Sequence, residues 1–295
     1  MEIIVFSGGL GNQLFQYAFY WMKKKTAADV EMNTYSIGRE GLHNGFELER
    51  LFGIKSGNTS QIVRLVRKIL IFQKKKHFKI PSALLLNLVK LTGVKIIQEQ
   101  GYSRFNPDYL KQRKGSVIYF GFWQSPLYFD AFQKEIRKVF SFDKLQLSGK
   151  SNALVTTIRS TESVSVHIRR GDFLAKDNKN INVPCDKAYY EKAISLITGK
   201  IKNPLFVFFS DDLDWVKENI SLSNAVYVDW NSGINSWQDM YLMSECKHNI
   251  IANSTFSWWG AWLNANKEKT VIAPAKFVNN VETPDIYPEN WIIVE

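Results

Sequence analysis

In the second half of the chain, short apolar runs alternate with amphipathic stretches, and this alternation restricts the fold more than any other feature. Apolar and polar residues alternate at 163–168, as in a strand, and further short strand patterns lie at 205–209, 225–228, 249–252 and 270–273. Helical patterns fill the intervals, at 187–197, 213–220, 237–244 and 256–263. Strands that alternate with helices form a parallel sheet covered by helices on both faces. The sequence therefore predicts an α/β fold with a Rossmann-like second half.

The first half opens with the same kind of unit. An apolar run at 3–6 leads into the glycine loop Gly8-Gly9-Leu10-Gly11, and apolar residues then recur at helical spacing through Trp21. Further helices are expected at 61–72 and 127–140, and a strand at 116–120. The polar stretch 141–150 has no periodicity. We therefore expect two Rossmann-like domains, 1–150 and 151–295, with the option that the final residues pack back on the first.

Composition indicates an ordinary globular protein. The 295 residues are 45% hydrophobic and 22% charged, which suits two modest cores. Met1 to Ser7 lead directly into a strand pattern, so no signal peptide is expected. No apolar stretch reaches the ~18 residues of a membrane span. Cys185 and Cys246 are the only cysteines, which excludes a disulfide framework and suggests a cytoplasmic location.

The net charge of +10 is concentrated in one segment. Residues 61–100 contain nine Lys and Arg and a single acid, Glu99. Such an excess suits nucleic acid, an anionic membrane surface or a phosphorylated substrate. A nucleic-acid-binding protein is disfavoured because the excess is local and no recognition module is present.

Three strands of the second half end in polar residues that can bind a ligand. The segments are His167-Ile168-Arg169-Arg170-Gly171-Asp172, Ser210-Asp211-Asp212, and Asn253-Ser254-Thr255 before a helix that starts near Phe256. Ligands of open parallel sheets bind just beyond the carboxyl ends of the strands. We therefore expect all three segments to line one edge of one sheet.

This set of residues suits a nucleotide diphosphate. Arg169 can hold phosphate oxygens in a bidentate fork. The hydroxyls of Ser254, Thr255 and Ser257, with the free amides at a helix start, form an anion site that needs no metal. Asp211 can accept hydrogen bonds from the N1–H and exocyclic amine of a guanine.

Each of these residues also has a purely structural interpretation. Arg169 and Arg170 can be surface charges that pair with Asp172. Ser254 and Thr255 can be plain helix caps. A lone histidine such as His167 is more often a core residue than a ligand, although its position two residues before Arg169 favours the site.

The glycine loop at the N-terminus has two interpretations. Gly9-Leu10-Gly11-Asn12-Gln13-Leu14 lacks the third glycine of the dinucleotide fingerprint, so it can be a tight strand-to-helix turn. Alternatively, Gly9 and Gly11 let the backbone approach donor phosphate or acceptor sugar across an interdomain cleft. Asn12 and Gln13 would then add polar contacts.

The sequence contains signals for two further kinds of ligand, a metal ion and a carbohydrate bound without catalysis. Asp212-Leu213-Asp214 matches the D-x-D pattern of metal-dependent glycosyltransferases, but acids in the first turn of a helix explain it as well. The histidines and cysteines offer no zinc spacing, so no metal ligands are expected.

Trp258, Trp259 and Trp262 are expected to face the core. A lectin would explain the tryptophans, but it would not need the phosphate cluster.

The motifs together resemble a known enzyme family. Gly8-Gly9-Leu10-Gly11-Asn12-Gln13-Leu14-Phe15-Gln16-Tyr17-Ala18 is similar to the opening motif of the family-11 α-1,2-fucosyltransferases, here of bacterial type. The segment 167–172 resembles the H-x-R-R-x-D motif that α-1,2-, α-1,6- and protein O-fucosyltransferases share. Phe209-Ser210-Asp211-Asp212, 253–259 and Gly121-Phe122-Trp123-Gln124-Ser125 are family-like as well. The motifs span nearly the whole chain, with none in 55–100.

The resemblance implies a GT-B architecture, two Rossmann-like domains with a cleft between them, with the donor on the C-terminal one. It implies inverting, metal-independent transfer of L-fucose from GDP-β-L-fucose to the 2-hydroxyl of a β-galactoside glycan, without a cofactor. Arg169 would neutralise the β-phosphate, and Asp211 would bind the guanine. Residues that would contact the rest of the donor are His167, Ser210, Asn253, Ser254, Thr255, Phe256 and Ser257.

The sequence leaves two questions open, which residue is the base and whether the acceptor is bound at a membrane. An inverting transfer needs a base for the incoming hydroxyl, and Asp172 is the first candidate, although the motif equally allows it to orient Arg169. The acceptor can be lipid-linked, because many bacterial sugar transferases act at the inner leaflet. Residues 61–79 can then bind an anionic membrane, or their apolar stripe (Ile62, Leu65, Val66, Ile69 and Leu70) packs on the N-terminal domain.

Overall fold

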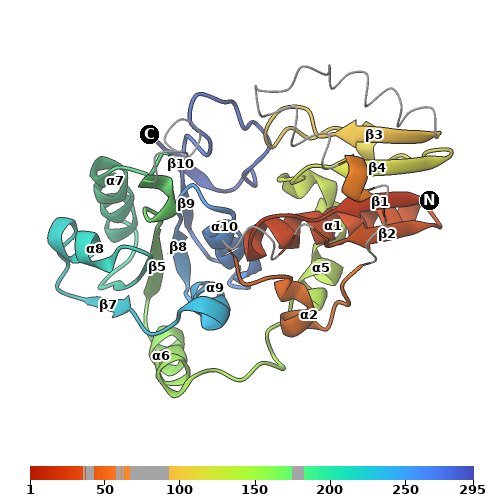
Figure 1. Ribbon diagram of the computed structural model, residues 1–295. Coiled ribbons are helices and arrows are strands. Elements are labelled where there is room, and N and C mark those ends of the chain that lie inside the picture. The colour runs from red at the N-terminus through yellow and green to blue at the C-terminus, as the bar shows by residue number, and fades with distance from the viewer. Residues whose placement is uncertain (36, 38–42, 58–60, 62, 67–92, 175–182) are drawn as a thin grey trace. The chain divides into compact units, whose positions relative to one another are not determined.

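The computed structural model describes residues 1–35, 37, 43–57, 61, 63–66, 93–174 and 183–295 (Figure 1). The chain forms two compact units, Met1–Phe140 and Ser141–Glu295. Each unit contains a parallel sheet with helices packed on it, which confirms the predicted α/β fold with two Rossmann-like domains. The division falls where the polar stretch 141–150 begins. The donor and acceptor roles of the two units stay predictions.

The first unit is built on a four-stranded sheet in the order β2-β1-β4-β3, in which every pairing is parallel. The strands are β1 (Glu2–Val5), β2 (Val30–Asn33), β3 (Val94–Gln98) and β4 (Ser116–Phe120). The helices include α1 (Leu10–Thr26), α2 (Glu47–Phe52) and α5 (Gln133–Val139). The predicted β1, α1 and β4 are therefore confirmed, whereas β2 and β3 were not predicted.

The helix predicted over 127–140 is wrong in its first half. The chain instead forms 3₁₀ turns at Pro126–Tyr128 and Asp130–Phe132 before α5 begins. Tyr128 and Phe129 are both buried, but successive side chains of an α-helix point in different directions. Irregular backbone at Phe129 (ψ 11°) lets both rings enter the core.

The second unit contains a six-stranded parallel sheet in the order β10-β9-β8-β5-β6-β7. Its strands are β5 (Ser163–Ile168), β6 (Leu205–Ser210), β7 (Ala225–Val228), β8 (His248–Ile250), β9 (Val271–Pro274) and β10 (Ile292–Val294). Its helices are α6 (Gly149–Ser160), α7 (Lys187–Thr198), α8 (Leu213–Asn219), α9 (Trp237–Glu245) and α10 (Thr255–Leu263). All predicted elements of this half are confirmed. The last residues belong to this sheet, because β10 pairs with β9.

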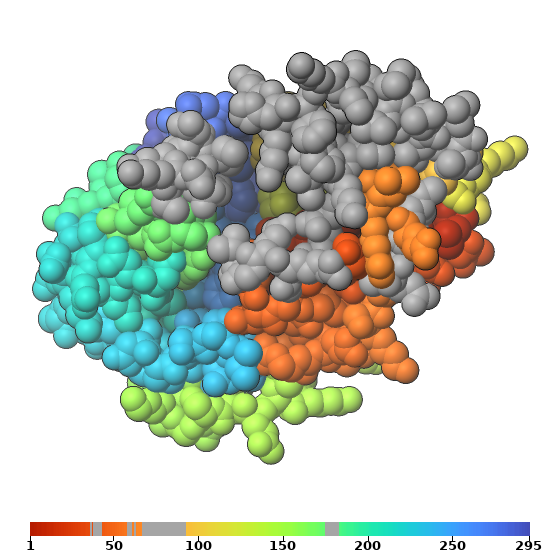
Figure 2. All heavy atoms as spheres, in the orientation of Figure 1, coloured from red at the N-terminus to blue at the C-terminus, as the bar shows by residue number. Residues whose placement is uncertain are grey.

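Helices cover both faces of the second sheet. Alternate residues of β5 and β6, such as Val166 and Phe208, pack with α7 and α8 in one core. The intervening residues of β6, such as Val207, pack with α6 and α9 in another. Figure 1 shows these two layers, and Figure 2 shows that α7 and α8 (green to cyan) form much of the visible surface of this unit. The sheet is therefore buried on both faces, and its carboxyl edge is left for a ligand.

Most of the basic segment 61–79 lies outside the described residues, including Ile62, Ile69, Leu70 and Lys74 to Lys76. Within the described part, Val63 and Val66 are buried against β1, β3 and β4 of the first sheet. Leu65 is exposed. Of the described stripe residues, Val66 therefore packs on the N-terminal unit as one interpretation predicted, whereas Leu65 does not, and Val63 takes part although it was not predicted. Among the described helices, none is long and apolar enough to cross a membrane.

Candidate functional site

The carboxyl edge of the second sheet brings the three polar segments together. Strands β8, β5 and β6 are neighbours, and Ile168 at the end of β5 pairs with Ser210 at the end of β6. Arg169 follows β5, Asp211 follows β6, and Asn253 lies between β8 and α10. The candidate site in this unit is therefore built around the central strand of the three.

Arg169 is held in place by two carboxylates. Its Nε lies 2.8 Å from Asp172 Oδ1, and its Nη1 lies 3.0 Å from Asp211 Oδ2. The Arg169 side chain is 34% exposed, so part of the guanidinium faces solvent. Two ion pairs restrict the rotamers of a long side chain and fix the plane of its fork. Arg169 is therefore a cation of defined orientation at the ligand-binding edge.

Arg170 ties the ends of β5 and β6 together. Its backbone N–H donates to Asp211 Oδ1 at 2.8 Å, and its Nε lies 3.0 Å from Asp212 Oδ2. Its guanidinium also lies over the Trp215 ring, 4.0 Å from the centroid. Of the ion pairs to Asp172 that the structural interpretation allowed, the one with Arg169 is present, whereas the Arg170 guanidinium pairs with Asp212. Arg170 instead shapes the loop that presents Arg169.

Gly171 makes room for this arrangement. A Cβ atom at Gly171 would lie 2.9 Å from Asp211 Oδ2 and 3.1 Å from its Cγ. Contacts this short require Asp211 to move. The glycine of the motif therefore lets the Asp211 carboxylate approach the backbone and reach both arginines.

The carboxylates of the D-x-D pattern serve the helix that follows. Asp212 is the N-cap of α8, since its Oδ1 accepts from the backbone N–H of Trp215 at 3.2 Å, and its other oxygen pairs with Arg170. Asp214 lies in the first turn of α8, where the helix dipole favours an acid. Across the described part of the chain, no group of three or more His, Cys, Asp or Glu could hold a metal ion. The geometry favours the capping interpretation of both residues.

His167 is buried at the second-last position of β5, two residues before Arg169. Burial and the positive charge of Arg169 lower the pKa of His167 to about 3, although Asp211 opposes the shift. The imidazole is therefore neutral at physiological pH. Its ring packs against Phe256 with centroids 5.9 Å apart, and its buried Nδ1 has no hydrogen-bond partner among the described residues.

The start of α10 contributes hydroxyl groups and backbone amides to the same edge. Ser254 is the N-cap, and its Oγ accepts from the backbone N–H of Phe256 at 3.4 Å. Ser254, Thr255 and Phe256 are partly exposed, whereas Ser257 is buried and its hydroxyl is within hydrogen-bond distance of the Ser254 carbonyl oxygen at 3.3 Å. Ser254 and Thr255 are thus better placed to meet a ligand than Ser257.

Asn253 and Ser210 are used within the protein. Asn253 Nδ2 donates to the carbonyl oxygen of Val183 at 2.9 Å, and Cys185 Sγ donates to Asn253 Oδ1 at 3.4 Å. Ser210 Oγ accepts from the backbone N–H of Asp212 at 2.9 Å. Both residues therefore hold chain segments beside Arg169. The tryptophans Trp258, Trp259 and Trp262 are buried, which confirms that they face the core.

The predicted residues of the glycine loop, Gly9, Gly11 and Asn12, belong to the first unit. Gly8 adopts φ +80°, and a Cβ there would lie 2.6 Å from Asn12 Nδ2, so this position requires glycine. Gly9 is the N-cap of α1. Gln13 Nε2 donates to the carbonyl oxygens of Gly8 and Gly45, at 3.0 and 2.9 Å. The loop is thus a fixed turn, and the Gln13 amide braces it rather than facing a ligand.

Several residues that shape these two edges were not among the predicted ones. Glu99 follows β3 and accepts two backbone N–H groups at the end of β4, and the buried Glu47 packs at the start of α1. One signal for Glu99 was present in the sequence, because it is the only acid in the basic segment 61–100. Glu47 had no such signal, since its role depends on a contact with α1 that the sequence does not reveal.

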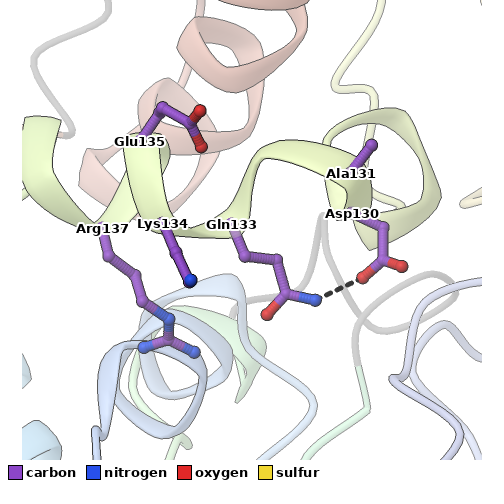
Figure 3. A pocket seen from close by; sticks show the side chains of 6 residues that line it. All are labelled: Asp130, Ala131, Gln133, Lys134, Glu135 and Arg137. Carbon is purple, nitrogen blue, oxygen red and sulfur yellow. Dashed lines mark hydrogen bonds between the residues drawn. The ribbon is translucent and has the colours of Figure 1, made fainter.

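A surface pocket on α5 lies apart from these residues. It is lined by Asp130, Ala131, Gln133, Lys134, Glu135 and Arg137 (Figure 3). Gln133 Nε2 donates to Asp130 Oδ1, so part of the lining is already paired. The side chains carry both signs of charge, and none is a predicted site residue.

Comparison with known proteins gives one family over the full length. The model of the family described as Glycosyl transferase family 11 matches residues 1–295. An alpha-1,2-colitosyltransferase of Escherichia coli is 34% identical, and the alignment covers 100% of both chains. The O-antigen biosynthesis glycosyltransferase WbnK of Escherichia coli is 30% identical over 97% of this chain and 98% of that protein.

More distant similarities extend to animals and to solved structures. A galactoside alpha-(1,2)-fucosyltransferase 1 of Oryctolagus cuniculus is 30% identical over 55% of this chain and 44% of its own length. The crystal structure of fucosyltransferase NodZ from Bradyrhizobium aligns with 88% of this chain and 91% of that chain, at 13% identity and a TM-score of 0.45.

Proposed function

The chain belongs to glycosyl transferase family 11, and we propose that it transfers L-fucose from GDP-β-L-fucose to the 2-hydroxyl of a β-galactoside, with inversion at the anomeric carbon. The full-length relatives are named for α-1,2 transfer of colitose and for O-antigen biosynthesis. The animal relatives are named for α-1,2 transfer of fucose to galactosides. These names support an α-1,2 linkage and a glycan acceptor.

The observation that carries the proposal is the orientation of Arg169 at the end of β5. A leaving nucleoside diphosphate gains negative charge as the glycosidic bond breaks. A guanidinium already fixed by Asp172 and Asp211 can stabilise that charge without reorganising. The amides and hydroxyls at the start of α10 lie at the same edge and suit the remaining phosphate oxygens.

The other donor contacts follow from this placement. Asp211 is the candidate for the guanine, because each of its oxygens retains accepting capacity beside the contacts to Arg169 and Arg170. His167, neutral and buried, offers an uncharged imidazole beside the sugar diphosphate. Asn253 and Ser257 support the backbone that carries Ser254 and Thr255.

Asp172 has the geometry of an orienting group. Its carboxylate lies 2.8 Å from the Arg169 Nε. This ion pair already engages the carboxylate with the cation that it orients. We therefore propose that Asp172 positions Arg169, and that the base for the acceptor hydroxyl is another group.

We also propose that the reaction needs no metal ion. Arg169 and the start of α10 supply the positive potential that a divalent cation supplies elsewhere. Asp212, the first acid of the competing D-x-D pattern, is already occupied by Arg170 and by the first turn of α8.

The proposal is tested by incubating the enzyme with GDP-fucose, GDP-colitose or other nucleotide sugars, each with a panel of galactosides. We expect GDP-fucose and a terminal β-galactoside to give an α-1,2-linked product, read by NMR. A clear preference for GDP-colitose would show that the proposed donor is wrong, while the proposed α-1,2 linkage would still hold. Transfer only with added manganese would instead favour the D-x-D enzyme.

The proposed cellular place of this reaction is the inner face of the membrane, where lipid-linked glycans are assembled. The support is the local excess of basic residues in 61–79. Because Val63 and Val66 are buried on the first sheet, the contact we propose is electrostatic and peripheral.

A further inference from the structure

A turn after β4 is fixed by an unusual set of contacts at the carboxyl edge of the first sheet. This turn, Gly121-Phe122-Trp123-Gln124-Ser125, is called the 121–125 turn below. Glu99 Oε2 accepts from the backbone N–H groups of Phe122 at 2.7 Å and Trp123 at 3.0 Å. The other oxygen, Oε1, is buried without a hydrogen-bond partner among the described residues. Burying a carboxylate oxygen costs free energy. The Glu99 carboxylate nevertheless holds this turn through two backbone N–H groups, which indicates that the turn conformation has a function.

The backbone of the turn is strained as well as pinned. Trp123 adopts φ +55°, which is uncommon for a residue with a bulky side chain. Its ring is fully buried and stacks on Phe19 with centroids 4.2 Å apart. At Gly121 a Cβ would lie 2.7 Å from the Glu99 Cβ. Strain of this kind persists only where the surroundings hold it, and it is concentrated at ligand-binding sites.

The 121–125 turn is bonded directly to the glycine loop. Strands β1 and β4 are neighbours in the sheet, so both loops leave the same edge. Gln16 Nε2 donates to the Gly121 carbonyl oxygen at 3.0 Å, and Gln124 Nε2 donates to Asn12 Oδ1 at 2.9 Å. The two family-like loops of this unit therefore form one rigid surface.

This surface exposes one aromatic ring of the turn. Phe122 is 38% exposed, while Trp123, Gln124 and Ser125 beside it are buried. An apolar side chain held at the rim of a ligand-binding edge by bonds to its own backbone is preorganised to meet a partner. In the same bonded pair of loops, Gln124 of the turn donates to Asn12 of the glycine loop, and the Asn12 side chain is partly exposed. Aromatic face and neutral amides suit a sugar ring, which has an apolar face and a rim of hydroxyls.

The start of α1 is closed to a phosphate. The Leu10 backbone N–H, the first of the helix, donates to the carboxylate of Glu47, which is buried. Arg50 Nη2 lies 3.2 Å from the same carboxylate. A phosphate at this helix start would have to displace an acidic side chain, whereas a neutral ligand beside it would not. The glycine loop therefore favours an uncharged sugar over the donor diphosphate.

We propose that the 121–125 turn and the glycine loop bind the acceptor galactose, that the Phe122 ring packs on the apolar face of this sugar, and that Glu99 is the positioning residue for the turn. The inference rests on the proposed function and specifies its acceptor subsite. Of the two ligands that the sequence left open for Gly9, Gly11 and Asn12, it assigns them to the acceptor sugar rather than to the donor phosphate.

The first test is the substitution Phe122→Leu. We expect the KM for the galactoside to rise about tenfold, the effect of losing one good aromatic contact. The KM for GDP-fucose, the slow hydrolysis of GDP-fucose and the affinity for GDP should stay within about twofold. Phe122→Tyr should keep the acceptor KM near that of the parent.

The matched control is Leu196→Ala. The exposed fraction of Leu196, 37%, is similar to that of Phe122, 38%. Leu196 lies near the end of α7, in the other unit. We expect no change in the KM for either substrate. A galactoside KM unchanged in Phe122→Leu, or raised equally in the control, would overturn the assignment.

The second test separates positioning from general stability at Glu99. Glu99→Ala removes both bonds to the turn, and we expect a higher galactoside KM with unchanged GDP affinity. Glu99→Gln keeps an accepting oxygen and should restore most of the loss. Should Glu99→Ala weaken GDP binding and galactoside use to the same extent, or should Glu99→Gln fail to rescue, the positioning role is refuted.

Failure of the acceptor subsite can be distinguished from failure of the proposed function. If the parent enzyme transfers nothing from GDP-fucose to any galactoside, the proposed function fails before any variant is compared. If the parent is active and Phe122→Leu keeps the acceptor KM of the parent, the acceptor subsite fails alone.

Discussion

Three carboxylates around Arg169 fix the orientation of its guanidinium and neutralise the neighbouring charge of Arg170. Asp172 and Asp211 hold Arg169, and Asp212 holds Arg170. Asp211 and Asp212 also accept from the backbone N–H groups of Arg170 and Trp215, so the loop after β5 has little freedom. An enzyme that stabilises a leaving diphosphate benefits from such preorganisation, because no reorganisation is needed as charge develops.

Replacing Arg169 by lysine is the most direct check of this arrangement. Lysine keeps the charge but loses the planar fork that two carboxylates hold. We expect kcat/KM to fall by on the order of 10²–10³, which corresponds to about 2.7–4 kcal/mol. Arg159→Lys is the control, since Arg159 pairs with Glu245 on α6 and α9. Near-native kinetics in Arg169→Lys would remove this residue from the mechanism.

A methyl group at Gly171 should have a similar effect without changing any charge. In Gly171→Ala the new Cβ would lie 2.9 Å from Asp211 Oδ2, so the Asp211 carboxylate must shift, and we expect its ion pair with Arg169 to be disturbed. We expect a large loss of activity with the far-ultraviolet circular dichroism unchanged. Gly149→Ala is the matched control, because a Cβ there meets nothing within 4 Å in the first turn of α6. It should leave activity intact and change stability by about 1 kcal/mol or less.

His167 makes folding sensitive to acid. Its pKa is about 3 in the folded protein, against an ordinary value of 6.5. Between these values the unfolded chain binds a proton that the folded chain does not, so the free energy of unfolding falls as pH falls. The contribution reaches at most ~1.4 kcal/mol per pH unit. In His167→Gln, denaturant titrations below pH 6.5 should show a shallower dependence, while above pH 7 the slopes should agree. Equal slopes in acid would show that His167 is not the responsible group.

At the scale of elements, the second half was predictable because its signals are redundant. Strand β6 is a continuous apolar run, β5 has a clear alternation of apolar and polar residues, and helices such as α8 have a side-chain cap, here Asp212. The first half lacks this redundancy. β2 contains Glu31 and Asn33 within four residues, and β3 contains Lys95, so neither has a clear apolar pattern. Their place in the sheet is set by pairing with β1 and β4, which no local pattern reveals.

The candidate site shows the same division between local and tertiary information. That Arg169, Asp211 and Ser254 share an edge follows from strand order in a parallel sheet, so sequence alone could predict it. Which carboxylate holds which arginine could not be predicted, since Asp172, Asp211 and Asp212 are equivalent in sequence terms. Glu47 likewise reaches α1 from a separate helix.

For the whole molecule, the source of positive potential decides whether a metal is required. We expect fucosyl transfer to continue in excess EDTA, because in the proposed reaction Arg169 and the start of α10 supply the positive potential for the leaving group. Asp214→Asn should reduce kcat by less than about threefold, since Asp214 contributes only a weak interaction with the dipole of α8. Activity lost in EDTA and restored by manganese would show that the D-x-D pattern binds a metal after all.

The net charge of +10 also predicts how the molecule behaves near a membrane. Lys74, Lys75 and Lys76 lie outside the described residues, but their charge acts at a distance of about 10 Å whatever their conformation. Val66 is buried on the first sheet, and we propose that attraction between the basic residues and anionic lipid dominates, so binding should depend on salt. We expect co-sedimentation with vesicles rich in anionic lipid at low salt and release as salt rises. Changing the three lysines to glutamate should abolish sedimentation, because each contributes about 1 kcal/mol near the surface. Transfer to a small soluble galactoside should remain. If transfer is lost together with sedimentation, the segment belongs to the acceptor site or to the fold, and the membrane proposal is wrong.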